Sequence, residues 1–229
     1  MQTAHPAEQE YDFSIHEQES ITEGFQRIIR EQIAFILRLY ESDEELSFTV
    51  HNSRKSFKRI RSTLRLIRYN MPEGWFKEQN SFFRDLSKQV SEMRDAHVLM
   101  ESLEILQQDP TLKINAFNSE ELIRIMRHDV ETQERRLREQ EVISKKHDLL
   151  QNHSVLKNWP VLGSSLIDIS PGLKRIYAKG FEAMQTAYLN PKADHFHEWR
   201  KQVKHLLYAR EILDLFWPVT AGCAYSEVK

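Results

Sequence analysis

Apolar residues recur along this chain with the period of amphipathic helices. From Ile21 to Tyr40 they fall every three or four positions, as expected for a helix with one buried face. The same periodicity predicts further helices over residues 47–69, 75–107, 119–147, 172–189 and 192–216. Pro-containing turns and the acidic run at 41–45 separate them. No segment alternates like a strand, so we expect an all-α fold.

Two short motifs each occur twice. HNSRKSFK at 51–58 and HEWRKQVK at 197–204 both fit H-x-x-R-K-x-x-K, and each follows a G-x-x-R-I motif, GFQRI at 24–28 and GLKRI at 172–176. The repetition predicts two related antiparallel helical units.

The expected division follows from this repeat. It gives a first bundle of four helices at 16–147, a linker at 148–171 and a partial second unit of two helices at 172–217, between a polar lead-in at 1–15 and a tail at 218–229. A second unit of the first one's size would need about two more helices, so we expect either that the sequence is part of a longer chain or that its second unit is abbreviated.

The predicted helix at 47–69 has one cationic face and one apolar face. Residues 46–72 hold seven Lys or Arg and no Asp or Glu, whereas a solvated helix face usually mixes both signs. Such a stripe repels itself and is stabilised when an anion binds. His51 and Arg65 lie about 21 Å apart at 1.5 Å per residue, which suits an extended polyanion. A histidine in the stripe adds a donor when protonated, so binding should strengthen as pH falls through the sixes.

The later helices repeat this arrangement. The segment 192–216 places its basic residues on one face, and Trp199, Val203, Leu206 and Leu213 opposite. The segment 172–189 places Arg175 and Lys179 on one side, and Leu173, Tyr177, Phe181 and Met184 on the other. Sites for single-stranded nucleic acid usually stack bases on aromatic rings, but here only Tyr208 lies near a basic face. Phosphate contacts without base contacts favour a polymer that has no bases.

Composition indicates a globular protein but does not identify a binding partner. The 229 residues are 40% apolar and 29% charged, as in globular proteins, and the net charge of −2 does not itself indicate an anionic ligand. The longest apolar run, IAFIL at 33–37, is too short for a membrane span, and the N-terminus lacks the features of a signal peptide. The single Cys223 suits a reducing compartment, so we expect a cytoplasmic protein.

These motifs resemble the CHAD domain, the conserved histidine α-helical domain, over most of residues 20–217. The resemblance rests on HNSRKSFKRIRSTLR at 51–65, Arg94-Asp95, GLKRIYAKG at 172–180 and FHEWRKQVKHLLYAREIL at 196–213. It implies two four-helix bundles around a basic cavity or pore. It also implies binding of inorganic polyphosphate without catalysis or cofactor, often near polyphosphate granules.

Matching positions give the polyphosphate-binding residues that the resemblance implies. In the first unit these are His51, Arg54, Lys55, Lys58, Arg61, Arg65 and Arg94, and Asp95 would orient a basic neighbour. In the second unit they are Arg175, Lys179, His197, Arg200, Lys201, Lys204 and His205. The region corresponding to Arg94-Asp95 of the first unit would fall beyond Lys229, so we expect one wall of the cavity either to be absent or to be supplied by another chain.

Other classes of function stay open at this point. His128-Asp129 and His147-Asp148 resemble pairs in HD-type metal phosphohydrolases, with His97 and Asp168 as possible further ligands. Simple metal binding is less favoured, because no Cys/His cluster has zinc spacing and cations surround the motif histidines. A nucleic-acid-binding or scaffold protein is the third class. We expect no catalytic residue and no metal site.

Overall fold

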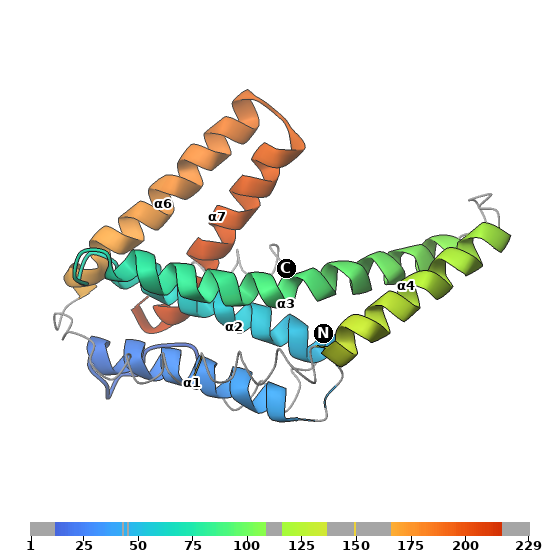
Figure 1. The fold of residues 1–229 in the computed structure, drawn as a ribbon. Coiled ribbons are helices and arrows are strands. Elements are labelled where there is room, and N and C mark those ends of the chain that lie inside the picture. The colour runs from blue at the N-terminus through green and yellow to red at the C-terminus, as the bar shows by residue number, and fades with distance from the viewer. Residues whose placement is uncertain are drawn as a thin grey trace. The chain divides into compact units, whose positions relative to one another are not determined.

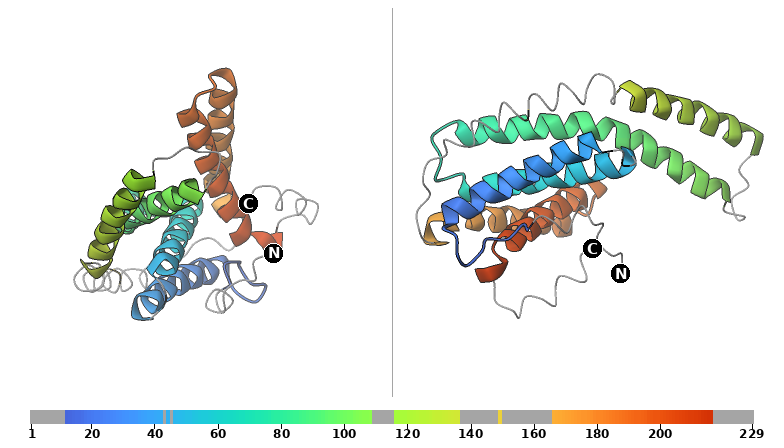
Figure 2. Two further views of the ribbon diagram at one scale, coloured as in Figure 1. Left: turned by 90° about the vertical axis from the view of Figure 1, so that its right-hand side faces the viewer. Right: turned by 90° about the horizontal axis from the view of Figure 1, so that it is seen from below.

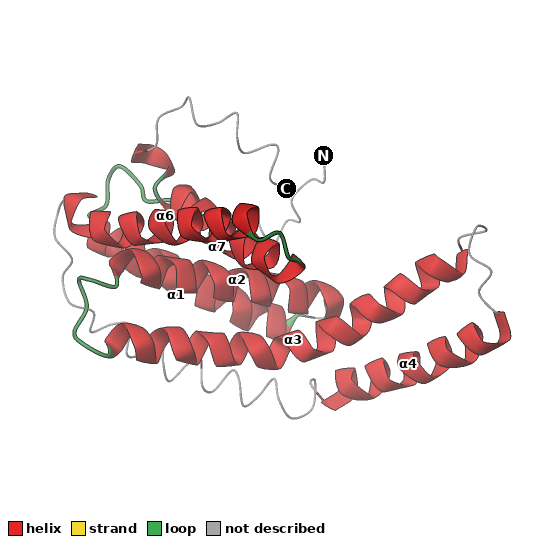
Figure 3. Ribbon diagram, turned by 90° about the horizontal axis from the view of Figure 1, so that it is seen from above, coloured by secondary structure: helices red, strands yellow, loops and turns green. Residues whose placement is uncertain are grey.

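The computed structural model describes residues 12–42, 44, 46–108, 116–136, 149 and 166–216. This part of the chain is helical and contains no strand, which confirms the all-α fold class (Figure 3). The helices are α1 (Ile21–Glu41), α2 (Leu46–Ile67), α3 (Trp75–Gln108), α4 (Ala116–Arg136), α6 (Leu166–Leu189), α7 (Ala193–Ile212) and the short 3₁₀ helix η3 (Asp214–Phe216) (Figure 1). None of the described helices is long and apolar enough to cross a membrane.

The first three helices end within a few residues of the predicted bounds, but the later ones differ. Helix α4 begins at Ala116, three residues before the predicted start at 119, and its predicted continuation from 137 to 147 lies outside the described residues. Helix α6 begins at Leu166, so Pro171 lies inside the helix and does not open it. The turn before Pro171 is held in place because Ile169 is buried and the Asp168 carbonyl accepts a hydrogen bond from Asn70 Nδ2 at 3.1 Å.

The described chain forms two compact units whose limits cut through helices. The first unit comprises Met1–Gln32, Arg59–Asn80 and Leu156–Lys229, and the second comprises Ile33–Lys58 and Ser81–Val155. The division expected from the repeat, at 16–147 and 172–217, stays a prediction.

In the first unit, α6 and α7 form an antiparallel hairpin (Figures 1 and 2). Helix α6 approaches the end of α2 closely at Gly172, where an added Cβ would lie against the backbone carbonyl oxygens of Leu66 and Arg65. Only a residue without a side chain permits this approach. The close contact brings one face of α6 beside the last turn of α2, and this junction is where the candidate site lies.

The end of the polar lead-in packs onto α7. The Ile15 N–H donates to the Ile212 carbonyl at 3.0 Å, and the ring of Phe13 meets Tyr208 edge-on with centroids 6.4 Å apart. The Arg59 guanidinium lies 4.7 Å from the Phe13 centroid and 3.7 Å from a Glu211 carboxylate oxygen. Tyr208, which the sequence placed near a basic face, is therefore half-buried in this packing.

The first G-x-x-R-I motif has a structural role. Arg27 donates to both carboxylate oxygens of Glu19 at 2.6 and 2.9 Å, to the Asp12 carbonyl at 2.9 Å and to the Ser14 carbonyl at 2.5 Å. Gly24 leaves room for Glu19 and Ile15 beside α1. The motif thus fastens the lead-in segment to α1.

The second unit has an apolar core built from α1, α2 and α3. Ile33 and Ile36 are fully buried, and Phe57 of α2 packs on Phe83 of α3 with ring centroids 6.4 Å apart. Phe57 here and Ile60 in the first unit, which is also fully buried, confirm the predicted apolar face of α2.

Candidate functional site

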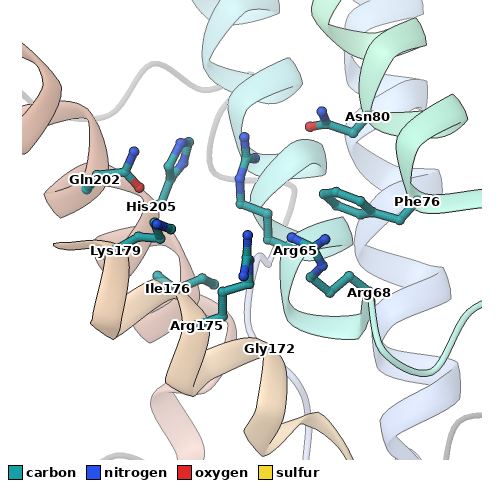
Figure 4. A pocket seen from close by; sticks show the side chains of 10 residues that line it. All are labelled: Arg65, Arg68, Phe76, Asn80, Gly172, Arg175, Ile176, Lys179, Gln202 and His205. Carbon is teal, nitrogen blue, oxygen red and sulfur yellow. The ribbon is translucent and has the colours of Figure 1, made fainter. Parts of the chain in front are cut away.

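A cavity of about 240 Å³ lies in the first unit where α2, the start of α3, α6 and α7 meet (Figure 4). It is lined by Arg65, Arg68, Phe76, Asn80, Gly172, Arg175, Ile176, Lys179, Gln202 and His205. Among the residues that the structure describes, the lining includes four cationic side chains and no carboxylate. This composition favours an anionic ligand over a cation or an apolar molecule.

Arg65 is the cationic residue of the cavity whose pKa burial lowers most clearly. Its Nη1 donates to the Arg61 carbonyl at 2.7 Å, a bond within α2 that fixes the side chain without neutralising it. Burial, reinforced by the charges of Arg61 and Arg68, lowers the pKa of Arg65 to about 10. Arg65 therefore stays protonated at neutral pH, and its charge is costly until an anion approaches.

Neighbouring side chains orient Arg68 and Asn80 without neutralising the charge of Arg68. The Arg68 guanidinium lies 4.4 Å from the Phe76 centroid and 5.3 Å from the Tyr69 centroid, so aromatic rings orient it. Asn80 Oδ1 accepts a hydrogen bond from Arg61 Nε at 3.1 Å. These contacts position one wall of the cavity before any ligand arrives.

Helix α6 contributes Arg175 and Lys179, one turn apart, and both are exposed. Lys179 Nζ pairs with Glu182 at 2.6 Å on the helix surface, whereas no carboxylate among the described residues pairs with Arg175. A surface pair of this kind is weak and can give way to a phosphate. Figure 4 shows Arg175 beside Arg65 from the facing helix.

His205 of α7 is a neutral member of the site. Its Nδ1 lies 3.4 Å from Ser62 Oγ, and burial, with the charges of Arg65, Arg61 and Lys201, lowers its pKa to about 3. The protonation expected in the sixes for a motif histidine therefore does not apply to His205 in the empty cavity. As a neutral imidazole it still offers a hydrogen bond.

The cavity unites some of the predicted residues and adds others. Of the predicted set, Arg65, Arg175, Lys179 and His205 line it, and Arg61 and Lys201 lie near enough to act on His205. Arg68, Phe76, Asn80 and Gln202 were not predicted. A signal existed for Arg68, which follows Arg65 by three positions and so shares its helical face.

Other predicted residues of the first unit do not line the cavity. His197 and Arg200 are exposed, Lys204 is half-buried, and Lys201 Nζ pairs with Glu198 at 2.9 Å, all on α7. Trp199, expected on an apolar face, is half-buried against the rings of Tyr188 and Phe196.

The N-terminal part of the α2 stripe belongs to the second unit. His51 is exposed there, and Arg54, Lys55 and Lys58 are half-buried, each with an interaction of its own. Their convergence with the residues of the first unit stays a prediction. Arg94 lies in α3, and its side chain is outside the described residues, as is that of Asp95.

None of the residues of the alternative metal site is among those that line this cavity. His128 and Asp129 are exposed on α4, while His147 and Asp148 fall outside the described residues. Within the described ranges, no group of three or more His, Cys, Asp or Glu side chains could hold a metal ion.

Comparison with known proteins places this chain in a family. Searches of curated proteins and of solved structures gave no match. A family model described as the CHAD domain matches residues 27–227, which is nearly the whole chain and includes every residue that lines the cavity. The chain therefore belongs to the CHAD domain family.

Proposed function

We propose that this protein binds inorganic polyphosphate through the cationic cavity of its first unit and does so without catalysis. The observation that carries the proposal is the convergence of Arg65, Arg68, Arg175 and Lys179 from two distant segments, with no carboxylate in the lining. Membership of the CHAD domain family is compatible with this ligand.

The electrostatics of the cavity favour a ligand dense in negative charge. Binding replaces repulsion among the arginines by charge-assisted hydrogen bonds, each worth about 1.5–3 kcal/mol. The guanidinium groups match phosphate oxygens in bidentate geometry, and Lys179 adds a mobile charge. A volume of about 240 Å³ falls below the roughly 300–1,000 Å³ of sites for organic ligands, so it suits a few phosphate groups of a chain.

Calorimetric titration with polyphosphate of defined length tests the proposal. The double variant Arg65→Gln/Arg175→Gln should bind at least about 10-fold more weakly than the wild type, because two charge-assisted contacts are lost. Arg124→Gln is the matched control, since Arg124 is exposed on α4 and pairs with Glu121 at 2.7 Å. Equal affinity of the double variant and the wild type would refute the cavity as the binding site.

Competition separates polyphosphate from nucleic acid. Duplex DNA or RNA at equal phosphate concentration should fail to displace bound polyphosphate, because a cavity of about 240 Å³ is too small to admit a double helix. Affinity should fall steeply with salt, because several cations release counterions together. Displacement at equal phosphate would instead favour the nucleic-acid-binding class.

The non-catalytic part of the proposal has its own assay. Purified protein with Mg²⁺ or Mn²⁺ should release no phosphate from polyphosphate, whereas turnover would favour the metal phosphohydrolase alternative. Association with polyphosphate granules would follow from binding and is tested by locating the tagged protein in cells that form granules.

A further inference from the structure

The α6–α7 hairpin carries an exposed aromatic face that the proposed polyphosphate site does not use. Tyr177, Phe181 and Tyr188 follow one side of α6 and are 60%, 46% and 69% exposed, and Phe196 of α7 is 43% exposed. Trp199 joins the two helices, with its ring centroid 5.7 Å from that of Tyr188 and 6.4 Å from that of Phe196. We refer to these five residues as the hairpin face.

The internal repeat shows that this face has the composition of a core. In the register of the G-x-x-R-I motif, Tyr177 and Phe181 of α6 correspond to Ile29 and Ile33 of α1. Both isoleucines are 0% exposed. The corresponding side of the repeated helix is therefore buried on α1 and exposed on α6. Exposed helix positions normally carry polar residues, so retention of large apolar side chains here indicates a surface that becomes covered.

The exposed area is large enough for association between two copies. At about 200 Å² per aromatic side chain, the exposed fractions of the four rings correspond to roughly 400 Å² per chain. Two such faces contribute roughly 900 Å². Flanking side chains such as Leu189, which is 87% exposed, bring the total toward the roughly 1,200 Å² at which specific interfaces begin.

We propose that the hairpin face binds the hairpin face of a second copy of this chain, so that two α6–α7 hairpins form a four-helix bundle. The face suits a two-fold contact because a patch that pairs with itself must carry no net charge, and all five of its members are uncharged. Two hairpins packed face to face would form an up-and-down four-helix bundle.

Sedimentation analysis of the full chain over about 1–100 μM tests this proposal. The wild type should shift from monomer to dimer with concentration, and Phe181→Glu/Tyr188→Glu should remain monomeric at every concentration. Ile125→Glu is the matched control, because Ile125 is an equally exposed apolar residue of α4, at 49%, and should leave the dimer intact. A wild type that stays monomeric, or a double variant that still dimerises, would overturn the proposal.

Two further measurements keep the result interpretable. Circular dichroism and polyphosphate titration of the double variant should match the wild type, since neither residue lines the cavity. Hydrogen exchange of the wild type should slow in α6 and α7 peptides as concentration rises. Unchanged exchange across that range would also count against the dimer, independently of any variant. Because polyphosphate binding is scored separately, failure of this proposal and failure of the proposed function are distinguishable.

Discussion

Gly172 of α6 lies directly against the backbone carbonyl of Leu66 at the end of α2. The contact sets the distance between two walls of the cationic cavity, because Arg65 precedes Leu66 and Arg175 follows Gly172 by three positions. Gly172→Ala should therefore destabilise the protein by about 1–3 kcal/mol, since the new methyl group forces α6 away from α2. Urea denaturation gives the stability change, and titration should show weaker polyphosphate binding.

Gly180→Ala is the control for that experiment. It lies in the same helix, and an added Cβ there would meet nothing within 4 Å. Alanine should stabilise α6 by up to about 1 kcal/mol through its helix propensity and leave binding unchanged. Similar stability changes for the two variants would contradict the close contact at Gly172.

The two arginines of the repeated G-x-x-R-I motif should respond differently to substitution. Arg27→Met should cost about 1–3 kcal/mol of stability, because Glu19 would lose the partner that holds its carboxylate among half-buried groups. Arg175→Met should leave stability nearly unchanged and weaken polyphosphate binding. Thermal unfolding and titration of both variants separate the roles. If Arg27→Met bound polyphosphate more weakly but had normal stability, the structural role of Arg27 would be contradicted.

The ion pair between Arg27 and Glu19 should also make the stability of the protein depend on pH. Burial by itself raises the pKa of Glu19, but hydrogen bonds from Arg27 and the His16 N–H more than reverse this, so the net pKa lies below the ordinary 4.5. The Glu19 carboxylate therefore contributes fully to the free energy of unfolding above pH 4.5. This contribution is lost as pH falls through the lower pKa that Glu19 has in the folded protein. Denaturation of wild type and Glu19→Gln between about pH 6 and 3 should show the two curves converging at acid pH.

Arg65→Met should separate ligand-free stability from binding. In the empty protein the variant should be as stable as the wild type or about 1 kcal/mol more stable, because a repelling and partly buried charge is removed. Saturating tripolyphosphate should stabilise the wild type by about 2.7 kcal/mol at 100 times the dissociation constant, and the variant by much less. Melting curves with and without the anion measure both effects. Equal stabilisation of both proteins would show that Arg65 does not meet the ligand.

His205 should make stability depend on pH. Because its pKa is about 3 in the folded protein and 6.5 for an unperturbed histidine, the unfolded chain binds the proton first as pH falls. The free energy of unfolding should thus decrease between pH 6.5 and 3, by at most about 1.4 kcal/mol per pH unit from this group.

The variant His205→Gln isolates this contribution. Its stability should fall less than that of the wild type between about pH 7.5 and 5, with the exposed His197→Gln as the control. A bound polyanion should raise the pKa of His205, so binding should take up a proton and strengthen on acidification. Parallel pH curves for His205→Gln and the wild type would contradict the burial of His205.

The periodicity of apolar residues was sufficient to predict the helices and part of the candidate site. The apolar face of α2, with Phe57 and Ile60, is buried as predicted because a long amphipathic helix has only one way to bury its stripe. The repeat and the family resemblance placed Arg65, Arg175, Lys179 and His205 in one set, and these four share one cavity. The expected shared space for the whole stripe from His51 onward stays a prediction.

Tertiary packing determines which side chains line the cavity and which are covered, and the sequence did not predict this. Nothing local shows that Arg27 is locked by Glu19 while Arg175 faces a cavity, since both occupy the same motif position. Phe76 and Asn80 reach the site only because α3 folds back beside α2, and no motif marks them. The side of α6 opposite Arg175 and Lys179 is apolar in sequence, yet Tyr177 and Phe181 there are exposed, because coverage depends on a neighbouring element rather than on the helix itself.

The cavity draws its walls from the end of α2, the start of α3 and the distant α6–α7 hairpin. A ribosome-bound chain therefore cannot present this site until His205 has left the exit tunnel, and closing so long a loop is slow compared with forming each helix. If the proposed function holds, a phosphate polymer would bind only chains in which these distant segments have come together, and would favour the folded state by mass action.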